Sequence, residues 1–257
     1  MKKIAVITGA SSGIGKQFFL QLPEKEKYDE IWVIARGKDA LEKLREETDR
    51  PLKVLPMDLS DQKSFKIYTD ALEAEKPVIG LLVNASGFGI FDSVEMTRME
   101  DAEGMVDLNC KALMKMTMLS LQYMASGSKV IEIASMAAFQ PIPYIDIYGA
   151  TKAFVLSFSR ALNQEVKPKG IQVMAVCPYW TKTKFFDRAV AAGREGVVKK
   201  YVVMYDPVDI VKRAYSDLAK GKDKSIYGFI AQGQALLCKL LPHKLVMHIW
   251  MKQQGLK

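Results

Sequence analysis

The sequence reads Thr8-Gly9-Ala10-Ser11-Ser12-Gly13-Ile14-Gly15 directly after a short apolar run, Ile4–Ile7. Glycines in such a turn let the chain reverse tightly and let its backbone approach a phosphate closely. The segment after the turn is amphipathic, and the N-terminus of a helix there presents free N–H groups and positive partial charge. A glycine-rich turn says little by itself, but between a first strand and a helix it is typical of a site for a dinucleotide pyrophosphate.

Outward from this unit, short apolar runs alternate with longer amphipathic segments. The runs that we predict as strands are Ile4–Ile7, Ile31–Ala35, Leu52–Leu55, Val78–Val83, Lys129–Ala134, Ile171–Val176 and Ser225–Ile230. The predicted helices include Asp39–Glu47, Asp61–Glu75, Arg98–Met124, Tyr148–Val166 and Pro207–Lys220. Most of the strands lack strict polar alternation, which indicates burial on both faces. We therefore expect one α/β domain of Rossmann type over residues 1–257, with a doubly wound, parallel seven-stranded sheet and helices on both faces.

Composition narrows the classes of protein to which this chain can belong. Its 257 residues fit one domain, and a hydrophobic content of 49% is ample for a core with two sides. The net charge of +8 comes from lysines spread along the whole chain, without a dense basic stripe or a basic run interleaved with aromatics. This pattern argues against nucleic acid as a partner. A diffuse positive field instead favours phosphate-rich cofactors or anionic substrates.

The spacing of the cysteines and histidines argues against a disulfide-rich protein and against a protein with a metal site. Cys110, Cys177 and Cys238 are widely spaced, so they form neither a disulfide framework nor a zinc motif. We expect reduced, buried thiols and a cytoplasmic location. His243 and His248 belong to no Cys/His/Asp cluster, so no metal site is expected. The first apolar run is too short for a signal peptide, and no run has the length that crosses a bilayer.

Two segments interrupt the alternation. Residues 184–205 separate the sixth strand from the next helix, and insertions at the carboxyl ends of parallel strands build ligand clefts, so we expect a substrate loop there. Residues 231–257 carry many leucines and Trp250 among lysines and glutamines. We interpret this apolar C-terminal segment first as a helix packed on the domain or on a partner subunit. A substrate lid and an anchor in a membrane surface are the alternatives, and the anchor is the least favoured.

The end of the second strand predicts which dinucleotide binds. An acidic residue there would hold the ribose 2′-hydroxyl of NAD and repel a 2′-phosphate. This chain instead has Arg36, followed by Lys38, and a planar, permanently charged guanidinium suits a phosphate. The alternative interpretation of Arg36 is a solvated cation in a turn. We predict NADP(H) rather than NAD(H) as the cofactor.

A second motif supplies groups for proton transfer. Tyr148 and Lys152 stand four residues apart in a predicted helix, so their side chains lie on one face. An isolated phenol has a pKa of about 10, and a neighbouring ammonium together with a positive nicotinamide would lower the pKa of Tyr148 enough for general acid/base work. Ser135 ends the fifth strand, where its hydroxyl can hold the substrate oxygen. Asn109 lies inside a predicted helix, where a buried amide either satisfies a backbone group or holds a water.

The order of these motifs resembles the short-chain dehydrogenase/reductase family. The pattern consists of TGxxxGxG at 8–15, Asn-Ala-Ser-Gly at 84–87, Asn109, Ser135 and Tyr148-x-x-x-Lys152, and it covers the chain to about residue 230. The resemblance implies a catalytic tetrad of Asn109, Ser135, Tyr148 and Lys152. In this tetrad Tyr148 is the acid/base and Ser135 orients the substrate oxygen. Lys152 holds the ribose and tunes Tyr148, and Asn109 anchors a water in a proton relay.

The motifs and the resemblance together give the expected ligand contacts. Those for the cofactor are Gly9, Ser11, Ser12, Gly13, Ile14, Gly15, Arg36, Asp58, Leu59, Asn84, Ala85, Ser86, Tyr148, Lys152, Pro178, Thr181 and Thr183. Those for the substrate are Ser135, Tyr148, Phe91, Tyr144, Tyr179 and Trp180, with Phe139 on a nearby loop. Two residues depart from the family pattern. Ser86 stands where alanine is usual, and Tyr179 stands where glycine is usual. The resemblance also implies homodimers or homotetramers through Arg98–Met124 and Tyr148–Val166.

The stretch Pro178-Tyr179-Trp180 resembles the branch of the family with 17β-hydroxysteroid dehydrogenases and long-chain 3-ketoacyl reductases. Its aromatics make a broad apolar wall if they face the cleft, and the alternative is ordinary core packing. We expect an NADP(H)-dependent oxidoreductase that interconverts a ketone and a secondary alcohol on a bulky apolar small molecule, in the first place a hydroxysteroid of bile-acid type. A role in steroid or lipid metabolism would follow.

Two alternatives to this function remain. The first is another enzyme, a 3-ketoacyl thioester reductase. The second belongs to a different class of protein, a sensor that binds NADP(H) without turnover. A sensor would be expected to lose the pair of Tyr148 and Lys152, and both residues are present.

Overall fold

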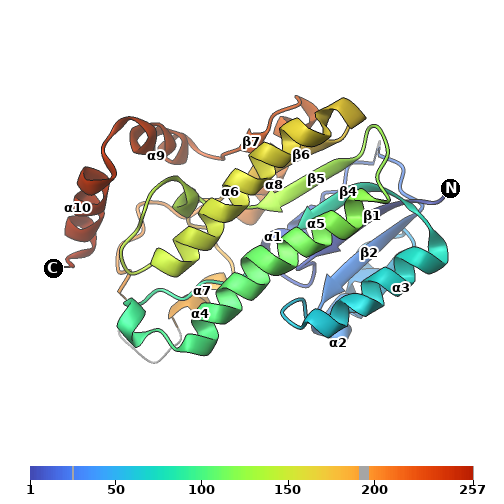
Figure 1. Ribbon diagram of the computed structural model, residues 1–257, viewed down its shortest axis with the longest axis horizontal. Helices are drawn as coiled ribbons and strands as arrows, with labels where there is room; N and C mark the ends of the chain where they lie inside the picture. The colour runs from blue at the N-terminus through green and yellow to red at the C-terminus, as the bar shows by residue number, and fades with distance from the viewer. Residues whose placement is uncertain (25, 191–196, 257) are drawn as a thin grey trace.

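The computed structural model describes residues 1–24, 26–190 and 197–256, and its centre is one seven-stranded sheet (Figure 1). Neighbouring strands are parallel, in the order β3-β2-β1-β4-β5-β6-β7. The strands are β1 (Lys3–Thr8), β2 (Glu30–Ala35), β3 (Leu52–Pro56), β4 (Val78–Asn84), β5 (Lys129–Ile133), β6 (Gln172–Val176) and β7 (Lys224–Ser225). The direction of winding reverses between β1 and β4, where doubly wound sheets bind their ligands. The expected fold class is confirmed.

Helices cover both faces of the sheet (Figure 1). One face carries α1 (Gly13–Leu20), α2 (Lys38–Glu42) and α8 (Pro207–Ala219). The other face carries α3 (Phe65–Glu75), α5 (Leu113–Leu121) and α6 (Asp146–Val166). The central strands are therefore buried on both sides, which explains why they are continuously apolar in the sequence.

The predicted helix Arg98–Met124 is irregular at its middle. A π-helical turn, Asp107–Ala112, joins α4 (Met99–Val106) to α5. Such a turn inserts one extra residue, re-aims the side chains and is frequent at functional sites. Asn109 lies in this turn and is fully buried.

The seventh predicted strand, Ser225–Ile230, is wrong over most of its length. β7 contains only Lys224 and Ser225, and α9 (Phe229–Leu240) begins inside the expected strand. Gly228 precedes α9 with a φ of 93°, and any side chain there would collide with the ring of Tyr205. The apolar run is too short for its periodicity to tell a strand from the first turn of a helix.

The apolar C-terminal segment, 231–257, forms most of α9 and all of α10 (His243–Gln254) at one end of the molecule (Figure 1); residue 257 lies outside the described residues. Trp250 anchors α10, because its ring stacks on Trp180 with 6.4 Å between centroids and its Nε1 donates to the Pro143 carbonyl at 3.0 Å. The segment therefore packs on its own domain. None of the helices in the described part of the chain is long and apolar enough to span a membrane.

The expected substrate loop, 184–205, begins with α7 (Phe185–Val190), and its residues 191–196 lie outside the described residues. The Phe91 N–H donates to the Ala189 carbonyl at 3.2 Å, which ties α7 to the loop after β4. Gln254 accepts hydrogen bonds from the N–H groups of Lys199 and Lys200, both at 3.0 Å. The described ends of this loop are thus held by the domain and by α10.

The turn between β1 and α1 provides a test of the fold. A Cβ at Gly15 would overlap the carbonyl oxygen of Gly9, so Gly15→Ala has to push β1 and α1 apart. We expect this change to lower the free energy of unfolding by about 2 kcal/mol or more and to abolish dinucleotide binding. Urea denaturation measures the first effect and fluorescence titration with NADPH the second.

Gly233→Ala in α9 is the matched control. No atom lies within 4 Å of the methyl group that it adds. Because alanine favours a helix, we expect it to raise the free energy of unfolding by about 0.5–1 kcal/mol. If both substitutions had the same small effect, the close approach at Gly15 would not constrain the fold.

Candidate active site

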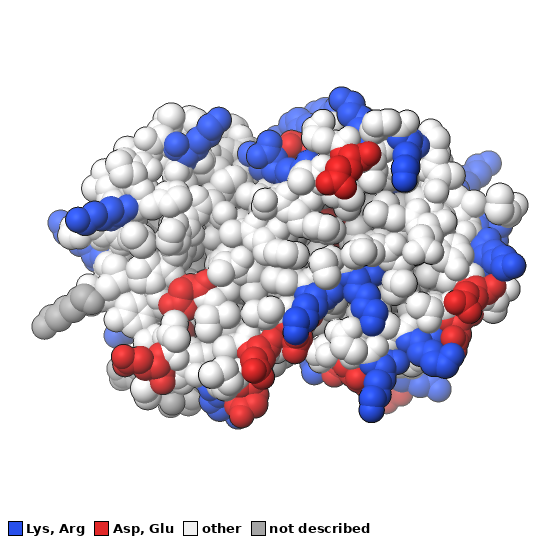
Figure 2. Space-filling model, in the orientation of Figure 1, with Lys and Arg blue, Asp and Glu red and all other residues white. Residues whose placement is uncertain are grey.

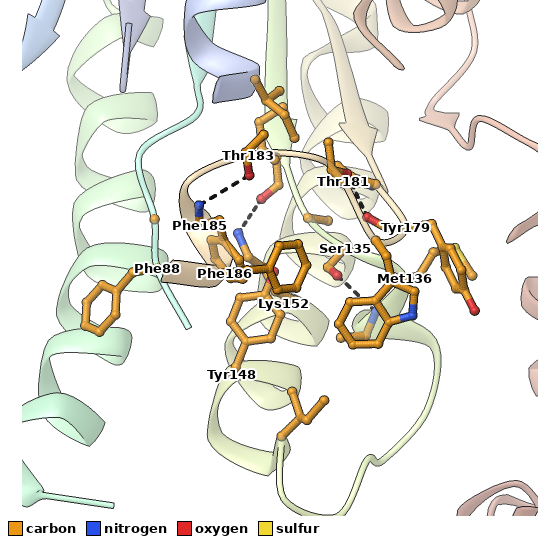
Figure 3. A pocket seen from close by; sticks show the side chains of 18 of the residues that line it. Phe88, Ser135, Met136, Tyr148, Lys152, Tyr179, Thr181, Thr183, Phe185 and Phe186 are labelled. Carbon is orange, nitrogen blue, oxygen red and sulfur yellow. Dashed lines mark hydrogen bonds between the residues drawn. The ribbon is translucent and has the colours of Figure 1, made fainter. Parts of the chain in front are cut away.

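A cavity of about 1100 Å³ opens at the carboxyl ends of the parallel strands. Its walls come from the turn after β1, from the loops after β2, β3, β4, β5 and β6, and from α9 and α10. Figure 3 shows Tyr148 and Lys152 on α6, with Ser135 close by on the loop after β5 and the rings of Phe185 and Phe186 near that of Tyr148. The cavity joins the predicted cofactor site and the predicted substrate site into one space.

The turn after β1 has the shape that a pyrophosphate requires. An added Cβ at Gly9 would lie 2.8 Å from the carbonyl oxygen of Ala85, and Gly13 has a φ of 54°. α1 begins at Gly13 without an acidic side chain in its first turn and without a side-chain hydrogen bond from Ser12. The N–H groups at the start of α1 border the cavity and carry positive partial charge. The turn therefore fits a dinucleotide.

The adenosine end of the site brings together further predicted contacts. Arg36, Asp58 and Leu59 line the cavity, as do Ala85 and Ser86. Arg36 is exposed at the rim, where a guanidinium can reach a phosphate. Asp58 accepts hydrogen bonds from the N–H and the hydroxyl of Ser60, at 3.0 and 2.6 Å, which holds its loop in place.

Three residues of the proposed tetrad border the cavity, namely Ser135, Tyr148 and Lys152. The Ser135 hydroxyl accepts a hydrogen bond from the Ala137 N–H at 3.1 Å and caps the turn after β5. The Lys152 Nζ donates to the Ile133 carbonyl oxygen at 2.7 Å and lies 5.7 Å from the centroid of the Tyr148 ring. β5 and α6 thus hold the three side chains at one place in the cavity.

Burial controls the pKa values of both groups on α6. Loss of solvent raises the pKa of Tyr148 to about 12, although a hydrogen bond with Ser135 lowers it in part. Loss of solvent also lowers the pKa of Lys152 to about 8. The lowered pKa that the sequence predicts for Tyr148 depends on the positive nicotinamide together with the ammonium of Lys152, and it stays a prediction. The chain's own groups keep Tyr148 protonated at neutral pH.

The Asn109 side chain makes three hydrogen bonds within the protein. Its Oδ1 accepts from the Phe88 N–H at 3.1 Å, and its Nδ2 donates to the Phe88 carbonyl at 2.8 Å and to the Thr151 Oγ1 at 3.0 Å. These contacts join the loop after β4 to α6, one residue before Lys152. The sequence left open whether Asn109 satisfies a backbone group or holds a water. The contacts with Phe88 show that it satisfies backbone groups.

Three other predicted contacts lie away from the described cavity wall. Asn84 is buried at the end of β4, where its Nδ2 donates to the Thr117 hydroxyl at 2.9 Å. Tyr144 has a left-handed backbone, with φ of 67°, and its neighbours Ile142 and Ile145 line the cavity in its place. Phe139 packs in a core cluster. Tyr144 and Phe139 as substrate contacts therefore stay predictions.

A buried carboxyl group, which no sequence motif marks, lies directly behind the site. Glu132 of β5 is 0% exposed, and its Oε1 accepts from the Thr117 hydroxyl at 2.6 Å and from the Asn84 Nδ2 at 3.3 Å. Among the described residues, Glu132 Oε2 and Asn84 Oδ1 are buried without a hydrogen-bond partner. Burial raises the pKa of Glu132 to about 7, and a protonated carboxyl would add the donor that two such acceptors lack. The only signal in the sequence is a charge inside an apolar strand.

Glu132 predicts a pH dependence of stability. Its pKa is raised from about 4.5 to about 7 by burial, so the folded chain keeps this proton more firmly than the unfolded chain. The stabilising contribution of the neutral form is complete below about pH 4.5 and is lost as the pH rises through about 7, a total of about 3 kcal/mol. Glu132→Gln, which resembles the neutral form, should remove this loss. Urea denaturation of both proteins at a series of pH values measures it, and an unchanged pH profile would contradict the assignment.

Aromatic side chains form the apolar half of the cavity. Trp180 has ring contacts at centroid distances of 6.0 Å with Phe91, 5.6 Å with Phe186 and 6.4 Å with Trp250. These four residues line the cavity, and so does Tyr179. The sequence left open whether Tyr179 and Trp180 form a wall of the cleft or pack in the core. Both are true, because each residue packs against a hydrophobic cluster and each borders the cavity. Phe185, Phe186 and Trp250 are wall residues that the motifs did not identify.

Comparison with known proteins shows what this chain resembles. The family model described as short chain dehydrogenase matches residues 3–193. The 17-beta-hydroxysteroid dehydrogenase type 3 of Mus musculus is 31% identical over 218 residues, which are 79% of this chain and 70% of that protein. The very-long-chain 3-oxoacyl-CoA reductase of Bos taurus is 34% identical over 189 residues, 70% of this chain and 60% of that protein. A solved short-chain dehydrogenase from Sphingobium yanoikuyae in complex with NADPH has a TM-score of 0.77 and 28% identity over 91% of this chain and 92% of its own.

This chain belongs to the short-chain dehydrogenase/reductase family. It is an oxidoreductase that acts on CH–OH and C=O groups with a nicotinamide cofactor. The predictions of the family and of the enzyme class are confirmed, and the NADPH of the Sphingobium structure agrees with the expected NADP(H). The match spans less than two thirds of the reductase, at 60% of its length.

Proposed function

We propose that this chain interconverts a ketone and a secondary alcohol on a bulky apolar substrate with NADP(H), in the first place on a hydroxysteroid of bile-acid type. The observation that carries the proposal is that Ser135, Tyr148 and Lys152 line one cavity together with the glycine turn and the aromatic wall. The phenol thus faces a space with one end suited to a dinucleotide and the other end suited to an apolar molecule.

In this mechanism Tyr148 moves the proton and Ser135 orients the substrate oxygen. The nicotinamide, when bound, supplies the hydride to the carbonyl carbon or accepts it from the alcohol carbon. In the reduction, the Tyr148 hydroxyl gives its proton to the substrate oxygen, and burial keeps that hydroxyl protonated at neutral pH. In the oxidation, Lys152 supplies the nearby positive charge that a phenolate needs. Asn109 positions the loop and the helix that carry these groups.

The cavity wall favours a rigid, flat substrate. Aromatic rings at Phe91, Trp180 and Trp250 offer large apolar surfaces, and a fused ring system covers them without losing much conformational entropy. Lys184 is exposed and also lines the cavity, so it suits the carboxylate of a bile-acid type molecule. The same lysine suits a phosphate of a thioester carrier, which is why a 3-ketoacyl thioester remains the second candidate.

The remaining predictions complete this proposal. We assign 184–205 and 231–257 to the substrate half of one domain. Subunits would meet as homodimers or homotetramers through α4, α5 and α6, where Met118 and Phe154 are exposed apolar residues. A cytoplasmic location would suit the three cysteines, which are free and buried.

Arg36 tests the choice of cofactor. Arg36→Ala removes the charge that would meet the 2′-phosphate, so the KM for NADPH should rise about tenfold to a hundredfold while the KM for NADH changes little. Initial rates with both cofactors measure this. Lys43→Ala, which removes a charge from an exposed position outside the cavity, is the control. An unchanged preference in Arg36→Ala would leave Arg36 as a solvated turn cation.

A substrate panel tests the reaction. NADPH oxidation is followed with ketosteroids, 3-ketoacyl thioesters and small ketones, and we expect the highest kcat/KM with ketosteroids. Trp180→Ala should lower kcat/KM about tenfold or more for ketosteroids and little for a small ketone, because only a bulky substrate reaches the wall. Trp180→Phe keeps an aromatic ring and should be milder.

Tyr148→Phe is the control for the chemical step. It should lower kcat about a hundredfold or more with every substrate and leave NADPH binding intact. A preference for thioesters would establish the second candidate instead. NADPH binding without turnover of any carbonyl compound would indicate a sensor and overturn the proposed function.

A further inference from the structure

Helix α9 turns its small side chains inward and its large side chains outward. The buried residues of this helix are Ala231, Ala235 and Cys238. By contrast, Phe229 is 91% exposed, Leu236 58% and Leu240 68%. Their spacing of seven and four residues places these three on one side of the helix, which we call the outer stripe. The stripe is the reverse of the usual arrangement, in which a surface helix buries its large apolar residues.

The helix with the outer stripe and the helix that follows it carry lysines and no carboxylates. From Lys224 onward the sequence contains five lysines and two histidines but no aspartate or glutamate. Lys239, Lys244 and Lys252 are exposed on α9 and α10, next to the exposed apolar residues Leu245 and Ile249. The region of Figure 2 over these two helices is accordingly white and blue. Exposed apolar side chains flanked by lysines are typical of surfaces that enter the headgroup region of an anionic membrane.

The same surface continues into the mouth of the cavity. Ile230, Leu237 and Ile249 are each about half exposed, and all three also line the cavity. α9 and α10 therefore form one rim of the opening. An apolar molecule that leaves a lipid layer at this rim can reach Tyr148 without crossing bulk water.

We propose that α9 and α10 hold this protein on the surface of an anionic lipid bilayer, with the mouth of the cavity facing the lipid. The attachment rests on the two helices alone. The delivery of a bulky apolar substrate from the membrane rests in addition on the proposed function. Attachment through α9 and α10 is peripheral, because each of these helices has 12 residues and about 20 are needed to cross a bilayer.

Charge favours lipid over a second copy of this chain as the partner of the outer stripe. A symmetric contact between two copies would pair the same patch with itself. It would then bring the lysines of α9 and α10 from both copies together, with no carboxylate on these helices to compensate them. Anionic headgroups provide the missing negative charge.

The experiment measures how the full chain sediments with vesicles. One preparation is pure phosphatidylcholine, and in the other part of it is replaced by phosphatidylglycerol. We expect binding to the anionic vesicles that weakens with salt. The triple variant Phe229→Gln, Leu236→Gln, Leu240→Gln changes residues outside the cavity lining and should weaken binding about tenfold or more. Removal of Lys239, Lys244 and Lys252 by exchange for Gln should weaken it about fivefold per lysine.

A matched control carries Ile67→Gln, Val94→Gln and Met99→Gln, which are exposed apolar residues on other elements and should leave vesicle binding unchanged. Turnover of a water-soluble small ketone by all variants shows that they fold. If the protein without substitutions did not sediment with anionic vesicles, the proposal would be overturned. An equal loss of binding in the control would also overturn it. A change of molecular mass in the outer-stripe variant without lipid would identify a subunit interface instead.

The design separates this proposal from the proposed function. Vesicle binding is measured without substrate, so binding without ketosteroid turnover would refute only the substrate. If ketosteroids are turned over, the outer-stripe variant should raise the KM for a ketosteroid dissolved in anionic vesicles at unchanged kcat. An equal KM for both proteins would refute delivery from the membrane.

Discussion

The rest of the structure depends on the contact between backbone segments at Gly9 and Gly15. A Cβ at Gly9 would lie 2.8 Å from the Ala85 carbonyl oxygen, and a Cβ at Gly15 would overlap Gly9 itself. This contact ties β1 to α1 and to the loop after β4. Strand β4 lies beside β1 in the sheet. The start of α1 and that loop therefore border the same space. Because this turn presents backbone N–H groups, its attraction for a pyrophosphate does not depend on the charge of a side chain.

β5 organises the second half of the site through nearly consecutive residues. Glu132 points into the core, the Ile133 carbonyl holds the ammonium of Lys152, and Ser135 meets the phenol of Tyr148. The same exclusion of water raises the pKa of Tyr148 to about 12 and lowers that of Lys152 to about 8. Both shifts favour neutral side chains, so the protein by itself does not make a phenolate. An additional positive charge in the cavity would favour one, which couples the proton to the oxidation state of the nicotinamide.

The sequence motifs predicted the parts of the fold in which local pattern and tertiary packing agree. Each of the first six strands begins and ends within one residue of its predicted bounds, because strands buried on both faces are apolar along most of their length. The glycine turn and Ser135 each follow a strand, and the carboxyl ends of parallel strands meet at one edge. Tyr148 and Lys152 lie on one face of α6 because they are four residues apart.

The sequence motifs say less where distant residues decide the local structure. Gly228 begins a helix instead of continuing a strand because of its left-handed φ and its fit against Tyr205. Tyr144 has a left-handed φ of 67° and lies outside the cavity lining. Glu132 acquires its partners from β4 and α5, which no local pattern connects to it.

The orientation of α9 is a further case, since the helix carries apolar residues on both sides and its sequence alone does not say which side is buried. The structure gives a steric reason for the choice. Large residues at Ala231 and Ala235 would push α9 outward, whereas small ones let its backbone come close to the domain. The same helix then lines the cavity with Leu237 and Cys238. The large residues Phe229, Leu236 and Leu240 lie on the opposite side of α9, outside the cavity lining and exposed, because the side that packs on the domain has room only for small side chains.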